Sequence, residues 1–104
     1  MTANEFFKNV ITTIKKIPKG QVATYGQVAK LSGKEHGARG VAWILHSSSR
    51  KHKLPWHRVI NAQGAISFPK GATHHSLQKR RLIKEGVEFT ESGKIRLADY
   101  QWQK

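Results

Sequence analysis

Apolar residues recur at steps of three and four along much of this 104-residue chain, and this spacing favours a mainly helical fold. Thr2-Ala3-Asn4-Glu5 has the form of a capping box at the start of a helix. Pro18-Lys19-Gly20 ends that helix, because proline lacks an N–H and glycine favours a turn. The apolar face between these signals consists of Phe6, Phe7, Val10, Ile14 and Ile17. A chain of this length forms one domain, so we expect a single domain over residues 1–104, mainly α with a small β component.

Two further helices are predicted in the first half of the chain. A second capping box, Thr24-Tyr25-Gly26-Gln27, opens a short helix that ends at Ser32-Gly33. A third helix follows from about Ala38 to Ser47. Two short helices joined by a tight turn are typical of a helix-turn-helix. On a helical wheel the third helix has an apolar side, formed by Val41, Ile44 and Leu45, and an outward side, formed by Arg39, Ala42, Trp43 and His46.

The middle of the chain has little periodicity. Residues 47–53 are polar and basic, which predicts a loop. Leu54 to Ile60 is the clearest extended segment, and it precedes a glycine turn at Gly64. Residues 65–72 contain Pro69 and Gly71 and predict another loop.

The last third of the chain predicts one more helix and a hairpin. The helix runs from about His74 to Glu85, and Gly86 suits the left-handed position after it. Alternation over residues 87–97 predicts a small hairpin. The residues of the helix expected to point inward are Leu77, Leu82 and Ile83.

The charge of the chain points to a polyanionic partner. Nineteen Lys and Arg residues oppose six Asp and Glu residues, giving a net charge of +13 and a pI near 10.6. Nucleic acid is the expected partner of so basic a domain. A membrane surface fits less well, because the basic residues are spread along the chain and do not gather on one amphipathic helix.

The chain contains no cysteine, which excludes disulfides, thiolate metal sites and a thiol nucleophile. The six histidines do not match the usual spacings of metal ligands, so we predict no metal and no cofactor. No apolar run approaches the length of a membrane span, and the N-terminus lacks the pattern of a signal peptide. We therefore expect an intracellular protein, in the cytoplasm or nucleoid or, in a eukaryote, in the nucleus.

Several ordered motifs resemble one known family. Residues 17–29, Ile-Pro-Lys-Gly-Gln-Val-Ala-Thr-Tyr-Gly-Gln-Val-Ala, resemble the opening of the C-terminal DNA-binding domain of O6-alkylguanine-DNA alkyltransferases. Residues 38–41 resemble the recognition helix of that domain. Residues 55–60, Pro-Trp-His-Arg-Val-Ile, are similar to the active-site segment Pro-Cys-His-Arg-Val-Ile. The resemblance covers about residues 5–87.

The departure from the family is at the reacting residue. Trp56 stands where the enzymes have the cysteine that accepts the alkyl group, and an indole has no comparable nucleophilicity. The chain therefore resembles the alkyltransferase-like proteins. This resemblance implies a protein that is not an enzyme, that binds O6-alkylguanine in duplex DNA by flipping the nucleotide, and that flags the lesion for nucleotide excision repair proteins.

The resemblance also implies roles for individual residues. Tyr25 is expected beside the phosphate of the turning nucleotide, and Arg39 in the gap that the flipped base leaves. Ala42 allows close approach of the recognition helix, Trp56 lines the lesion pocket, and Val59 offers a carbonyl to the guanine edge. The DNA- and lesion-binding set that we predict is completed by Thr24, Ser48 and Lys70.

Three more residues are expected to support the pocket. His57 and Glu85 resemble the family's proton-relay pair, which without a thiol becomes a structural hydrogen bond, and Arg58 is expected to anchor the same region. Where the family has an Asn-Pro hinge, this chain has Ser48-Ser49. A Tyr-Ser-Gly pocket wall is replaced by residues 69–71, Pro-Lys-Gly, which predicts a wider pocket that accepts bulkier alkyl groups.

Two other readings remain open. One is a general helix-turn-helix protein, regulatory or architectural, without lesion preference. The other is an enzyme, such as a glycosylase, that uses a group other than a thiol; Glu85 would be the residue to test. A monomer is expected in each case.

Overall fold

Helices form most of the structure, and one very short sheet joins the N-terminal helices to the last third of the chain. The computed structural model describes all residues 1–104. Its elements are, in order, α1 (Ala3–Lys15), β1 (Ala23–Thr24), α2 (Tyr25–Leu31), α3 (Ala38–His52), the 3-10 turn η1 (Trp56–Arg58), β2 (Val59–Ile60), α4 (Thr73–Lys84) and α5 (Leu97–Tyr100). The predicted mainly α fold with a small β component is confirmed.

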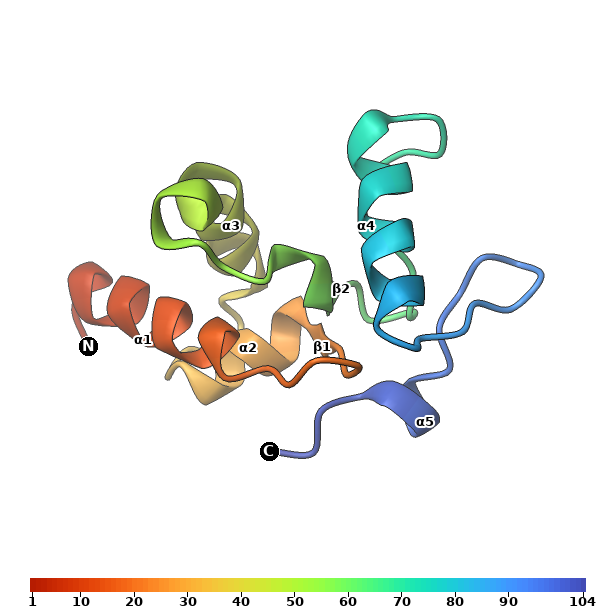
Figure 1. Cartoon of the computed structure of the whole chain (residues 1–104). Helices are drawn as coiled ribbons and strands as arrows, with labels where there is room; N and C mark the ends of the chain where they lie inside the picture. The colour runs from red at the N-terminus through yellow and green to blue at the C-terminus, as the bar shows by residue number, and fades with distance from the viewer.

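The three N-terminal helices pack around one core (Figure 1). The side-chain oxygens of Thr2 and Thr24 cap α1 and α2 by accepting from backbone N–H groups at 3.1 and 3.0 Å, as the two capping boxes predict. The buried residues of this core come from the predicted apolar faces and include Phe6, Val10, Ile14, Val28, Ala29, Val41 and Ile44. The second and third helices therefore form the expected pair, held on α1.

A short parallel sheet lies between these helices and α4 (Figure 1). In it Ala23 pairs with Val59 and Thr24 with Ile60. Alternate residues along β2 and along the stretch that leads into β1 face different cores: Ala23 and Val59 belong to the core of the N-terminal helices. Val22 and Ile60 belong to a second apolar cluster, together with Leu82 of α4, Val87 and Ile95. The sheet thus fixes the position of α4 relative to α2 and α3.

The C-terminal segment extends this sheet, which the sequence did not indicate. Val22 pairs with Gln101 in a parallel bridge. The N–H of Val22 donates to the carbonyl of Tyr100 at 2.9 Å, and the N–H of Trp102 donates to the carbonyl of Val22 at 2.7 Å. α5 was not predicted either, since a four-residue helix is too short to produce a period.

The predicted end of the third helix is wrong. α3 continues through the expected loop at residues 47–53 and ends at His52, with Lys53 in the left-handed conformation. Ser48 is buried against the core side, and the Ser49 hydroxyl donates to the carbonyl of Leu45 at 2.6 Å. Tertiary burial of Ser48 outweighs the usual preference of serine for loops, and the Ser49 hydroxyl is satisfied within the helix. Basic residues in the last turn suit the negative end of the helix dipole.

α4 agrees with the prediction in its ends and differs in one face. Gly86 has a φ of 96°, as expected, and the N–H of Val87 bonds to the carbonyl of Leu82. Ile83, expected to point inward, is 52% exposed. Gln78 is buried in its place, because its amide donates to the carbonyls of His57 and Val59 at 3.1 and 3.0 Å.

The remaining segments are less regular than predicted. Residues 54–60 contain the turn η1 and only two strand residues. Residues 87–97 fold back with a single antiparallel bridge, Phe89 opposite Ile95, and form no hairpin strands. Gly64 makes the expected turn, with a φ of 81° and its carbonyl accepting from the N–H of Ile95. None of the helices is long and apolar enough to cross a membrane.

Candidate functional site

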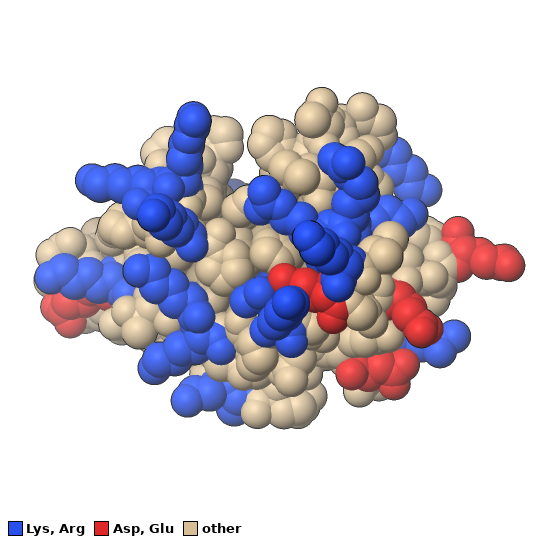
Figure 2. All heavy atoms as spheres, viewed as in Figure 1, with Lys and Arg blue, Asp and Glu red and all other residues tan.

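A cavity of about 900 Å³ opens between α3 and α4. The space-filling view shows a notch at this place, between the upper ends of the two helices (Figure 2). Five of the residues that line the cavity are on α3, four are on α4, and the loop between β2 and α4 closes one side. The helical lining residues are Ala42, Leu45, His46, Ser49, Arg50, His74, Leu77, Gln78 and Arg81.

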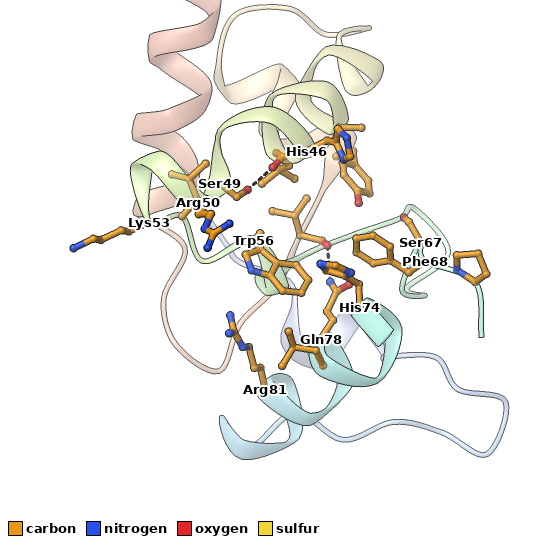
Figure 3. A pocket seen from close by; sticks show the side chains of 17 residues that line it. His46, Ser49, Arg50, Lys53, Trp56, Ser67, Phe68, His74, Gln78 and Arg81 are labelled. Carbon is orange, nitrogen blue, oxygen red and sulfur yellow. Dashed lines mark hydrogen bonds between the residues drawn. The ribbon is translucent and has the colours of Figure 1, made fainter. Parts of the chain in front are cut away.

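Trp56 lies between the two walls of this cavity (Figure 3). Its ring meets Phe68 edge-on at 6.1 Å between centroids, and His74 at 5.9 Å. Phe68 and His74 stack on each other at 5.2 Å. The guanidinium of Arg81 lies over the indole at 5.4 Å from its centroid. These four side chains form an aromatic and cationic wall that we call the aromatic box.

The local backbone explains how Trp56 reaches the cavity. Pro55 precedes it with a fixed φ of −76°, and the N–H of Trp56 donates to the carbonyl of Leu54 at 2.8 Å. Leu54 is buried in the first core, whereas Trp56 is only half-buried. The tight turn therefore anchors one side chain and turns the other toward the open space between the helices.

The charges around the cavity are positive. Arg50, Lys53 and Arg81 line it, and no acidic residue does. Residues 1–87 hold sixteen of the nineteen Lys and Arg residues and three of the six acidic residues, so the whole net charge of +13 lies there. Residues 88–104 carry three of each and are neutral. Lys and Arg cover much of the face in view, and acidic side chains gather mainly at the end where residues 88–99 lie (Figure 2).

Behind Trp56 lies a buried ionic network centred on Glu85. Its carboxylate accepts from Nε2 of His57 at 2.8 Å and from two nitrogens of Arg58 at 2.8 and 3.0 Å. The N–H of Gly20 donates to the same carboxylate at 3.2 Å, and Arg58 also donates to the carbonyl of Ile17. The hydrogen bond expected between His57 and Glu85 is therefore present, and Arg58 connects it to Ile17, just after the end of α1.

The protonation states of this network follow from burial and hydrogen bonding. Burial lowers the pKa of His57, despite the nearby Glu85 carboxylate, so the imidazole is neutral near pH 7. Burial would raise the pKa of Glu85, but hydrogen bonds from Arg58, His57 and the Gly20 N–H lower it to about 2. With Nε2–H donating to an ionised Glu85, Nδ1 of His57 carries no proton and has no hydrogen-bond partner. The network holds η1 against the end of α4 beside the cavity.

Four of the predicted binding residues lie together in the structure. Tyr25, Ala42, Trp56 and Val59 all line the cavity. The carbonyl of Val59 already accepts a hydrogen bond from Gln78, which leaves one lone pair for another donor.

The other four lie outside it. Arg39 is exposed near the N-terminal end of α3, one turn before Ala42. Thr24 is buried and caps α2, and Ser48 is buried on α3. Lys70 is exposed in the loop before α4. Thr24 and Ser48 are thus placed to support the two helices, and neither faces the cavity.

Sequence reasoning missed much of the aromatic box. His74, Gln78 and Arg81 recur at helical steps, so the face that they share could have been found from their spacing. Phe68 lies in a loop without a period and gave no signal.

No three His, Asp or Glu side chains lie together in a way that could hold a metal ion.

Comparison with protein families and curated proteins gives consistent matches. Residues 5–87 match the model of the DNA-binding domain of 6-O-methylguanine DNA methyltransferase. A DNA base-flipping protein of Vibrio parahaemolyticus is 45% identical over 100 residues, covering 96% of this chain and 98% of that protein. Alkyltransferase-like protein 1 of Schizosaccharomyces pombe is 36% identical over 107 aligned positions, covering 99% of each.

Solved structures agree. The S. pombe alkyltransferase-like protein in complex with damaged DNA containing O6-carboxymethylguanine superposes with a TM-score of 0.86, with 37% identity and full coverage of both chains. The Mycobacterium tuberculosis O6-methylguanine methyltransferase superposes with a TM-score of 0.63 at 26% identity, over 81% of this chain and 50% of that enzyme.

Proposed function

This chain belongs to the family of the 6-O-methylguanine DNA methyltransferase DNA-binding domain, among its alkyltransferase-like members, and we propose that it binds O6-alkylguanine in duplex DNA without removing the alkyl group. The observation that carries the proposal is Trp56. It stands in the cavity between α3 and α4, at the position of the family's nucleophilic cysteine, in a chain that has no cysteine. The damaged nucleotide turns out of the stack and occupies this cavity.

The cavity suits an alkylated base better than guanine. Alkylation converts a polar O6 acceptor into an apolar ether, so an aromatic wall favours the lesion. One to a few methylene groups against such a wall are worth on the order of 1–3 kcal/mol, or about 10- to 200-fold in affinity. Trp56 and Phe68 supply that wall, while Arg81 and Arg50 supply positive charge for an anionic adduct such as carboxymethyl. The S. pombe relative was solved with DNA carrying that adduct.

Tyr25 and Arg39 open the duplex in this proposal. Tyr25 lies at the first residue of α2 and reaches the cavity, so its phenol can press and hydrogen-bond the phosphate of the turning nucleotide. Arg39 is exposed on α3 and enters the space that the base leaves, where a planar guanidinium stacks and hydrogen-bonds the unpaired base. Ala42 keeps the surface of α3 low at the mouth of the cavity, which lets the backbone of the DNA approach closely.

The test is fluorescence-anisotropy binding to matched duplexes that contain one O6-methylguanine or plain guanine, at fixed physiological salt. We expect at least tenfold tighter binding to the lesion, which is about 1.4 kcal/mol. Trp56→Ala should lose most of that ratio, whereas its affinity for plain duplex should stay within about twofold, because phosphate contacts dominate nonspecific binding. Mass spectrometry of the protein after incubation with the lesion should show no added methyl group.

Equal binding of the wild-type protein to both duplexes would contradict the proposal. It would favour a general helix-turn-helix DNA-binding protein, a role for which the net charge of +13 and the α2–α3 pair are equally suited. Release of a free base that depends on Glu85 would instead indicate a glycosylase. The ion pairs that Glu85 already makes with Arg58 and His57 favour a structural role.

We propose further that the bound lesion is passed to nucleotide excision repair, since the chain has no cysteine to accept the alkyl group. The measurement is incision of the lesion duplex by a purified excision nuclease system, with and without the protein. A rise in incision that disappears with Trp56→Ala is the expected result. Unchanged or reduced incision would contradict this step while leaving lesion binding intact.

A further inference from the structure

Trp43 is the most exposed of the large apolar side chains, with 66% of its surface accessible. It lies on α3, whose buried face is complete without it, because Val41 and Ile44 are 0% and 5% exposed. An indole in this position contributes little to the core. Tryptophan is enriched at binding interfaces and among the residues that dominate their affinity, so an exposed indole that the core does not need is a candidate contact residue.

The place of Trp43 relates it directly to the cavity. Its ring lies 6.3 Å from that of His46, one turn further along α3, with an angle of 35° between the planes. His46 lines the cavity, and so does Ala42, which precedes Trp43. Trp43 is therefore beside the mouth of the cavity. Arg39 is one turn earlier on the same exposed side of the helix, at the spacing of neighbours on a helix surface.

The positive charges around Trp43 favour nucleic acid as the partner that it contacts. Arg39 and Arg50 are exposed on the same helix, and the whole net charge of +13 lies in residues 1–87. A protein partner that approaches this face would need a strongly acidic surface, whereas a duplex supplies regularly spaced phosphates with apolar base and sugar faces between them. Apolar side chains commonly act as wedges against base steps in this way.

We infer that Trp43 stacks against the base pair next to the flipped nucleotide and holds the duplex open at that step. This inference rests on the proposed function, because it requires a nucleotide in the cavity. Arg39 then fills the space that the flipped base leaves, and Trp43 covers the exposed face of the neighbouring pair. The two side chains divide the unstacked site between a hydrogen-bonding group and an apolar surface.

The experiment compares Trp43→Ala and Trp43→Phe with the wild-type protein on lesion and plain duplexes. An aromatic stacking contact of this kind is worth roughly 10- to 100-fold in affinity on replacement by alanine. We expect a loss in that range for Trp43→Ala on the lesion duplex, a much smaller loss on plain duplex, and recovery of most of the affinity in Trp43→Phe. Ile83→Ala is the matched control, since it removes another exposed apolar side chain and lies on a helix face that does not line the cavity.

A second readout separates stacking from general affinity. With 2-aminopurine in the pair next to the lesion, at saturating protein, Trp43→Ala should change the fluorescence of the bound probe and Ile83→Ala should not. Lesion preference in the wild type together with unchanged affinity and probe signal in Trp43→Ala would overturn the inference alone. Absence of lesion preference in the wild type would overturn the proposed function and this inference with it. Thermal unfolding of each variant checks that the fold is retained.

Discussion

Glu85 connects three distant parts of the chain at the residue scale. Its carboxylate holds the loop at Gly20, η1 through His57 and Arg58, and the end of α4 where it resides. Two features of the backbone favour glycine at position 20. Its φ is 86°, which other residues rarely adopt, and a Cβ there would lie 3.2 Å from the backbone carbonyl oxygen of Glu85, closer than most Cβ contacts.

This network makes stability fall on acidification. The pKa of Glu85 is lowered to about 2 and that of His57 is also lowered, so in both cases the unfolded chain binds protons more readily than the folded one. The stabilisation is complete above the unfolded pKa values. It declines as the pH falls below about 6.5 for His57 and, for Glu85, from about 4.5 towards 2.

Urea unfolding between pH 7 and pH 3 measures this dependence. Glu85→Gln should cost about 3 kcal/mol at pH 7, because it leaves Arg58 and its neighbours without a counter-charge, and should flatten the pH profile. Glu88→Gln is the control, since Glu88 is exposed and makes no ion pair. Equal pH profiles for wild type and Glu85→Gln would show that the network does not contribute in the way its geometry indicates.

The identity of single residues was predictable where a motif carries them and unpredictable where only the fold brings them together. Trp56 and the His57–Glu85 pair follow from the segment at residues 55–60 and its downstream glutamate. Phe68 and His74 meet Trp56 only because the loop before α4 folds over η1. No local pattern encodes that approach.

At the scale of the helices, the separation of α3 and α4 determines how large an adduct fits between them. The cavity of about 900 Å³ is far larger than a base with one methyl group requires. We predict that a benzyl lesion binds at least as tightly as a methyl lesion, measured by competition on otherwise identical duplexes. A strong preference for methyl alone would contradict the prediction, and Phe68→Ala should weaken the benzyl complex more than the methyl complex.

The C-terminal segment, although far from α2 in the sequence, contacts it directly and supports it. Beyond its backbone bonds to Val22, the carbonyl of Trp102 accepts from the side chain of Gln27 at 2.7 Å, and Gln101 bonds the same side chain. Deletion of residues 100–104 should lower the melting temperature by roughly 10 °C or more, as about 2–3 kcal/mol is lost in a domain of this size. Deletion of residues 103–104 alone, which are exposed, should change it by about 2 °C or less. Equal melting temperatures would contradict the role of this segment.

Helix starts were more predictable than helix ends or the C-terminal segment. The caps of α1 and α2 are local, so the threonines at residues 2 and 24 identify them from the sequence. The end of α3 depends on burial of Ser48, and the strand-like pairing at Gln101 joins residues about eighty positions apart. Both are products of tertiary contacts.

Charge acts at the scale of the whole molecule. If five to seven phosphates are neutralised in the complex, the logarithm of affinity should fall with the logarithm of salt concentration at a slope of roughly −4 to −6. Anisotropy titrations on plain duplex from low to physiological salt measure this slope. A slope near zero would contradict DNA binding altogether.

The class of partner was the easiest property to predict, since it depends on composition. A preference for lesions could not be predicted from composition, because it depends on the shape and lining of the cavity.

The uneven distribution of charge gives the molecule an electric dipole. Residues 1–87, which include every residue that lines the cavity, carry the whole net charge and are drawn toward DNA, whereas the neutral stretch of residues 88–104 feels little attraction. We therefore expect the field of a duplex to turn the protein as it diffuses so that its basic surface faces the phosphates, which raises the rate of productive association.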